Sequence, residues 1–178
     1  MVGVQIGAKP DSGFDDPIGM LKDCHRRIES FLQVLCLVAD RARGRRLSDE
    51  EAAAVKSALS YFRSGGQRHT ADEEESLFPR MRGQLDASQV EELHRLEDDH
   101  RRANELHEEI DELYQIWLES GLLSEDNQQT LLESAKELEG IYKAHIKVEE
   151  EAVFPQAART LDKASIEAMG HEFRARRA

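Results

Sequence analysis

A stretch of eleven residues occurs twice in the chain, and each copy carries a histidine and a glutamate four positions apart. The copies span residues 69–79 and 145–155. A shorter echo upstream begins at His25 and returns at His100, with almost the same offset. This repetition predicts two helical hairpins, each of which supplies one lone histidine and one His-x-x-x-Glu pair.

Residues four apart on a helix share one face, and here that face is also the apolar seam. Glu73 and Glu149 should therefore be buried, and no Lys or Arg lies on the seams to pair with them. An unpaired buried carboxylate is costly, so a cluster of cations would offset both. A single seam histidine is usually an ordinary core residue, but one on each of four helices favours a metal site. The candidate ligands, all expected at one depth of the bundle, are His25, His69, Glu73, His100, His145 and Glu149.

The ligand types narrow the choice of metal. Imidazole and carboxylate without a thiolate suit iron, manganese or zinc. Two bridging carboxylates with terminal histidines favour a dinuclear iron site over a structural zinc, which is normally one four-coordinate ion. Ferritin-like bundles use more carboxylates and a Glu-x-x-His spacing, whereas this chain has His-x-x-x-Glu.

The hydrophobic periodicity predicts four long helices, a short amphipathic helix near 163–175, and no strand. Candidate N-caps stand before each long helix: Asp16, Ser48, Ser88 and Ser124. Short connections between long helices indicate an all-α, up-down-up-down four-helix bundle with a short C-terminal helix. We expect a flexible N-terminal tail over 1–15 and one domain of two helical-hairpin repeats over 16–178.

Composition limits the partners. The net charge of −12 disfavours nucleic acid and anionic membranes, and no apolar run is long enough to span a bilayer. Cys24 and Cys36 stand on one predicted helix, roughly 18 Å apart, too far for a disulfide. Two unpaired thiols indicate a reducing compartment, so we expect a cytoplasmic protein, either a monomer or a weak homodimer.

With these motifs in view, the chain resembles the hemerythrin-like (HHE cation-binding) family over residues 16–175. The resemblance rests on the six candidate ligands, and on the Phe-Pro that follows each His-x-x-x-Glu pair. It implies a bundle around two non-haem iron ions, which an oxo or hydroxo group can bridge. The histidines of the first half would be terminal ligands of one iron and those of the second half of the other. The two glutamates would bridge.

Two departures from the family's oxygen carriers matter. The carriers have a further histidine four residues after the third-helix histidine, where this chain has Asn104. They also end in His-x-x-x-x-Asp, where this chain has the pair ending in Glu149. These differences favour a protein that binds or reacts with O2, NO or peroxide over simple reversible O2 carriage. The alternative is an iron-handling, iron-centre repair or sensor protein without turnover, and enzyme activity stays open; a third reading is a structural metal.

One position breaks the repeat. Tyr142 aligns with Gly66, and both lie one turn before a candidate ligand histidine. Tyr142 is either a core aromatic that fills the gap left by Gly66, or a phenol near the metal that tunes the centre. We expect small oxidants to enter beside Gly66. Among the glutamates that flank the bridging pair, we expect most to be solvated and one to contact a ligand histidine.

Overall fold

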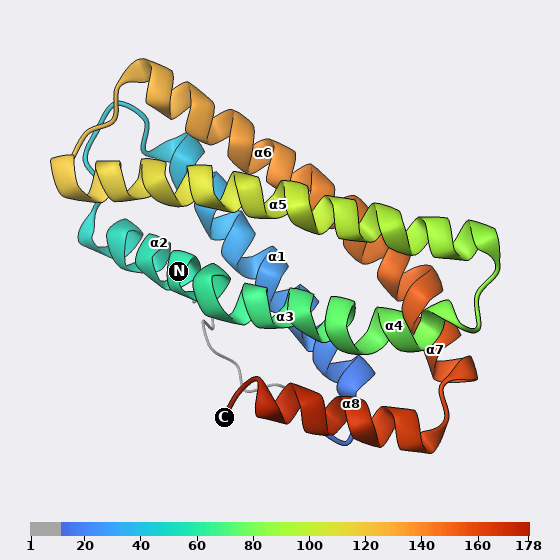
Figure 1. The fold of residues 1–178 in the computed structure, drawn as a ribbon. Helices are drawn as coiled ribbons and strands as arrows, with labels where there is room; N and C mark the ends of the chain where they lie inside the picture. Colours follow the sequence, from blue (N-terminus) through green and yellow to red (C-terminus); the bar gives the residue numbers. More distant parts are fainter. Residues whose placement is uncertain (1–11) are drawn as a thin grey trace.

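The computed structural model describes residues 12–178, and among these it contains helices and no strand (Figure 1). The predicted all-α helical bundle is thereby confirmed. Residues 1–11, most of the predicted flexible tail, lie outside the described part. In order, the elements are α1 (Pro17–Arg41), α2 (Asp49–Tyr61), the π-helical η1 (Phe62–Gly66), α3 (Gln67–Ala71), the π-helical η2 (Asp72–Leu77), α4 (Phe78–Arg82), α5 (Ala87–Ser120), α6 (Glu125–Val148), the π-helical η3 (Glu149–Val153), α7 (Phe154–Thr160) and α8 (Lys163–Ala175).

These elements form four rods that lie side by side, as Figure 1 shows. The first rod is α1 and the third is α5. The second rod runs without a break from α2 to α4, and the fourth runs from α6 through η3 into α7. The shorter α8 crosses one end of the bundle, where it packs against α1 and η2. The predicted C-terminal helix over 163–175 has the bounds that the structure gives to α8.

Cap residues set most of the helix starts. Asp16 accepts a hydrogen bond from the backbone N–H of Gly19, and Ser48 forms a capping box before α2. The predicted cap at Ser88 is wrong. The N-cap of α5 is Asp86, two residues before Ser88, and it forms a capping box with Gln89. Aspartate and serine are equally good caps, so the spacing alone did not decide between them.

The π-helical segments were not predicted, since the periodicity indicated uninterrupted α-helices. They cluster around the candidate ligands: α3, which carries His69, lies between η1 and η2, and η3 begins at Glu149. Each of η2 and η3 precedes a proline, Pro79 or Pro155. Proline has no N–H to donate and its ring crowds the preceding turn, so a wider turn accommodates it. Such segments often occur at functional sites.

The apolar core is divided into two clusters with the candidate ligands between them. On α1, Leu21 belongs to the smaller cluster and Ile28 to the larger, and His25 lies between the two. On α5, His100 is placed in the same way between Leu96 and Ala103. The bundle therefore encloses a polar layer between two apolar ones, and that layer is shielded from water on both sides.

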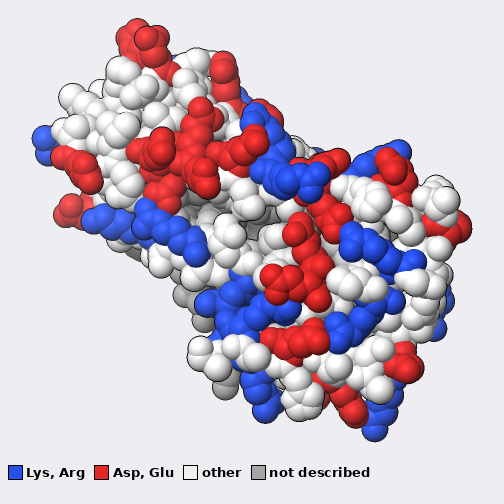
Figure 2. All heavy atoms as spheres, viewed as in Figure 1, with Lys and Arg blue, Asp and Glu red and all other residues white. Residues whose placement is uncertain are grey.

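The C-terminal helix closes the smaller cluster. Phe173 is fully buried in it, and Phe14, which precedes α1, packs against the same cluster. Gly170 allows this approach, because a Cβ at that position would collide with the backbone carbonyl of Phe14. On the surface, Figure 2 shows acidic and basic side chains interspersed over the visible face. None of the described helices has the length and hydropathy needed to cross a membrane.

Candidate metal centre

All six predicted ligands meet in the polar layer. They form two groups in which every candidate ligand atom lies within 4.8 Å of the others. The first group is His25, His69, Glu73 and Glu149; the second is Glu73, His100, His145 and Glu149. Both glutamates belong to both groups. The geometry therefore offers two adjacent cation positions that share two carboxylates, each with its own pair of histidines.

The distances follow the same division. Glu73 Oε1 lies 3.3 Å from His69 Nε2, and Glu73 Oε2 lies 3.3 Å from His100 Nε2. Each oxygen of this carboxylate thus faces a different group. Glu149 repeats the pattern, with Oε1 at 3.3 Å from His145 Nε2 and Oε2 at 3.0 Å from His25 Nε2. Both side chains are placed to bridge.

No described residue satisfies the polar atoms at the centre with a hydrogen bond of good geometry. Glu73 and Glu149 are both 0% exposed, and none of their four oxygens makes a hydrogen bond of good geometry. The Nε2 atoms of His25, His100 and His145 are also buried and also lack a hydrogen-bond partner among the described residues. Buried polar atoms in folded proteins are ordinarily paired. A pair of divalent cations would satisfy these oxygens and ring nitrogens together, so the residues fit the ions that the motif implies.

Carboxylates orient three of the four histidines from behind. His25 Nδ1 donates to Glu150 at 2.8 Å, and His100 Nδ1 donates to Glu74 at 2.8 Å. We predicted one such contact from the flanking glutamates, and the structure contains two. Such partners fix the ring and leave Nε2 to face the metal.

The third contact was missed. His145 Nδ1 donates to Asp99 at 3.3 Å. Asp99 lies on α5, directly before the candidate ligand His100, but its side chain contacts His145 on the neighbouring α6. This contact depends on the packing of α5 on α6 and could not be predicted from either segment alone.

The pKa values of the candidate ligands are set by burial and by the neighbouring carboxylates. Burial alone would lower the pKa of every ligand histidine, but neighbouring carboxylates raise the pKa of His25 to about 11 and that of His100 to about 10. The pKa of His145 rises to about 9 for the same reason. At His69 burial prevails, and the pKa falls to about 4. Burial would raise the pKa of Glu73, yet the surrounding histidines hold it well below its usual range.

These pKa directions predict proton release on metal binding. At pH 7 the three histidines with raised pKa carry a proton that a ligating imidazole must lose, whereas Glu73 is already ionised. Loading both positions should therefore release about three protons per chain, and metal affinity should fall as the pH is lowered from 8 to 6. Calorimetric titrations in two buffers of different ionisation enthalpy measure the number. An enthalpy of binding independent of the buffer would show that these three histidines carry no proton before the metal binds.

Beside the centre lies a second polar pair. The Tyr142 phenol and His107 Nε2 are 3.0 Å apart. Burial raises the pKa of Tyr142, and the charges of Glu73 and Glu149 raise it further. The remaining histidines are exposed, at His94 and His171.

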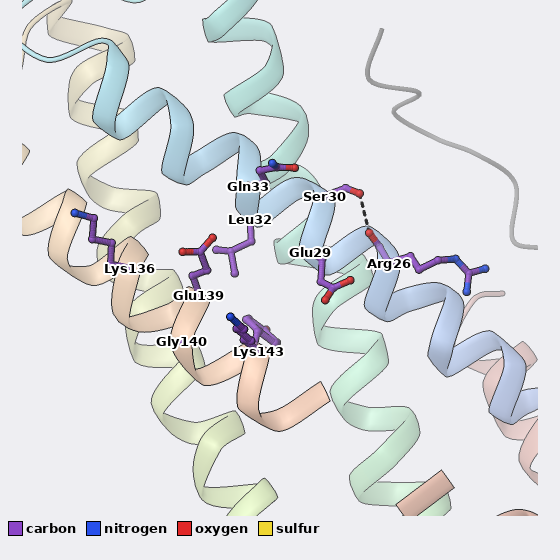
Figure 3. Close-up of a pocket in the computed structure, with 10 residues that line it drawn as sticks. Arg26, Glu29, Ser30, Leu32, Gln33, Lys136, Glu139, Gly140 and Lys143 are labelled. Carbon is purple, nitrogen blue, oxygen red and sulfur yellow. Dashed lines mark hydrogen bonds between the residues drawn. The ribbon is translucent and has the colours of Figure 1, made fainter. Parts of the chain in front are cut away.

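Two hollows reach the Tyr142–His107 pair from the surface. A groove of about 770 Å³ lies between α1 and α6, with Tyr142 in its wall; Figure 3 shows Glu29 of α1 and Gly140 and Lys143 of α6 along it. A smaller hollow of about 100 Å³ lies beside α5 and has His107 in its wall. This smaller hollow lies near Gly66, because Phe62 lines the hollow and is also the side chain that a Cβ at Gly66 would contact. Each hollow thus has one member of the pair in its wall.

Fold and site together define a helical bundle with two adjacent groups of candidate cation ligands that share two carboxylates. The chain belongs to the hemerythrin family: the model of the Hemerythrin HHE cation binding domain matches residues 16–157. This range contains all six candidate ligands and excludes α8. The family resemblance seen in the sequence is confirmed. Among curated proteins, none matches the chain.

Proposed function

We propose that the protein is a non-haem di-iron protein that binds or reacts with a small oxidant, namely O2, NO or peroxide. The observation that carries the proposal is that Glu73 and Glu149 each lie between two histidine pairs, and that within residues 12–178 their oxygens have no other buried partner. Two adjacent cations repel each other, and two carboxylates between them offset that repulsion. A single structural ion would leave one histidine pair without a role.

The ligand chemistry favours iron. Four imidazoles and two carboxylates form a donor set of intermediate softness, which suits iron better than calcium or magnesium. Iron, when bound, supplies the electrons and the open coordination positions that small oxidants require. The chain itself holds the rings in place through Glu74, Glu150 and Asp99, and excludes bulk water with the two apolar clusters.

Metal analysis combined with an optical titration tests the proposal. The purified protein should contain about two iron ions per chain. The spectrum of the reduced protein should change when O2, NO or peroxide is added. Turnover supports an oxidant-consuming protein, and a stable adduct without turnover supports the alternative of a sensor or iron-handling protein. One zinc ion per chain with no spectral response contradicts the di-iron proposal.

The presence of Asn104 favours a reaction with small oxidants over the storage of oxygen. It stands where oxygen carriers have a further histidine, and its side chain accepts from Gln67 at 3.2 Å instead of facing the ligand groups. With two histidines for each ion, the centre keeps coordination positions open. Tyr142 is proposed to tune it through its phenol, and Tyr142→Phe, compared in the same optical titration, separates that role from packing.

The entry of small oxidants beside Gly66 remains a prediction. Substitutions at two glycines, Gly66 and Gly140, test it. A Cβ at Gly66 meets only the Phe62 ring, at 3.4 Å, whereas a Cβ at Gly140 meets nothing within 4 Å. Gly66→Val should slow the binding of NO to the reduced protein several-fold without changing iron content. Gly140→Val, in the groove of Figure 3, is the matched control and should leave the rate unchanged. Stopped-flow absorbance measures both, and slowing by the control alone would place the route between α1 and α6.

Location and assembly are also proposals. Cys24 and Cys36 are free, and Cys24 is buried, as expected of thiols in a reducing compartment. On that ground we propose a cytoplasmic protein. The exposed large apolar side chains among the described residues are scattered (Leu37, Ile116 and Leu122), which favours a monomer or a weak homodimer.

A further inference from the structure

Two contacts of the centre correspond to each other under the sequence repeat, as a two-fold relation between the halves would require. His25, from the first half, donates through Nδ1 to Glu150 of the second half at 2.8 Å. His100, from the second half, donates through Nδ1 to Glu74 of the first half at the same distance. Each half thus supplies the orienting carboxylate for the other.

One contact has no counterpart under this symmetry. His145 Nδ1 donates to Asp99 at 3.3 Å. The repeat relates His145 to His69, since each begins a copy of the His-x-x-x-Glu motif. It also relates Asp99 to Cys24, since each immediately precedes the lone histidine of its half. The equivalent of the Asp99 carboxylate is therefore a thiol.

His69 shows the consequence of this replacement. It is 3% exposed, and its Nδ1 atom has no hydrogen-bond partner among the described residues. Cys24 is buried on the side of α1 that meets the second rod, where its carbonyl accepts from Tyr61 at 3.4 Å. A thiol is a weak acceptor, so Cys24 cannot do for His69 what Asp99 does for His145.

A carboxylate behind a ligand histidine fixes the ring and strengthens its nitrogen as a donor, and losing one costs about 10–100-fold in metal affinity. Building on the two-metal function proposed above, we propose that the two positions differ in affinity. The ion between His100 and His145 is held tightly, and the ion between His25 and His69 is exchangeable. Cys24 and Asp99 are the positioning residues that set the difference.

A titration of the metal-free protein with Co²⁺ under anaerobic conditions tests this through the visible absorption of the bound ion. We expect two Co²⁺ per chain, bound in two steps whose affinities differ by about 10–100-fold. His69→Ala should abolish the weak step and keep the tight one. His145→Ala should remove the tight step instead, which identifies the two positions.

Three further variants assign the difference to the two positioning residues. Cys24→Asp supplies the missing carboxylate and should bring the two steps to within a few-fold. Cys24→Ala, the matched control, removes the thiol without adding a carboxylate and should leave the separation unchanged. Asp99→Ala should weaken the tight step; its side chain is 41% exposed, so this variant should fold even if Cys24→Asp does not.

The failures of the two proposals are distinguishable. Binding of two Co²⁺ in one step, or an unchanged separation in a folded Cys24→Asp or Asp99→Ala variant, overturns this inference and leaves the two-metal function intact. Saturation at fewer than two Co²⁺ per chain overturns the two-metal function itself, and the inference falls with it.

Discussion

Glu149→Gln is expected to reduce the metal content from about two ions per chain to less than one. The glutamate is placed to bridge the two proposed positions, since its two oxygens lie 3.0 and 3.3 Å from histidine nitrogens of different groups. Glutamine keeps the size of the side chain but removes the charge that two adjacent cations require. Since loss of an orienting partner alone costs about 10–100-fold in affinity, loss of a shared ligand should cost roughly 100-fold or more at both positions.

The neighbouring Glu151 provides a control within the same motif. It is exposed and belongs to neither ligand group, so Glu151→Gln makes the same chemical change two residues away. Iron content after purification and Co²⁺ affinity of the metal-free protein should be unchanged in this variant. Full iron occupancy in Glu149→Gln would show that the glutamate does not bridge.

Much of this centre could be predicted from the sequence because the ligands lie on the apolar seams. A seam that repeats every three or four residues fixes the face of each helix, and burial of that face brings the seams together. His69 and Glu73, one turn apart, therefore had to point inward on the same side. Helix starts followed equally well where local chemistry decides them, as at Ser48, which caps α2 as predicted.

The unpredicted features depend on the contacts between helices. A π-helical turn adds one residue to a turn, and the apolar spacing of η1, η2 and η3 gave no sign of it. The contact of Asp99 with His145 joins α5 to α6, so its partner is not visible along either segment. The missing partner of His69 became apparent only when the observed contacts were compared across the repeat.

The helix α8 lies outside the residues matched by the family model, yet we expect it to stabilise the bundle. Phe173→Ala should destabilise the protein by about 3–5 kcal/mol, the usual cost of removing a buried phenylalanine. Phe173 is fully buried in the smaller cluster, beside the rings that cover the centre, Phe78 and Phe154. Those rings stack on His100 and His25, respectively. The cavity would therefore loosen one wall of the polar layer.

The same helix also holds η2, which carries Glu73. Arg176 and Arg177, which directly follow α8, pair at 2.9 and 2.6 Å with the buried Asp72, one residue before Glu73. Detachment of α8 should thus free η2, so Phe173→Ala should lower both the unfolding midpoint in urea and the iron content. Phe173→Leu, which fills most of the cavity, should recover most of both. A variant that loses the stability but keeps two iron ions would show that α8 covers the bundle without positioning Glu73.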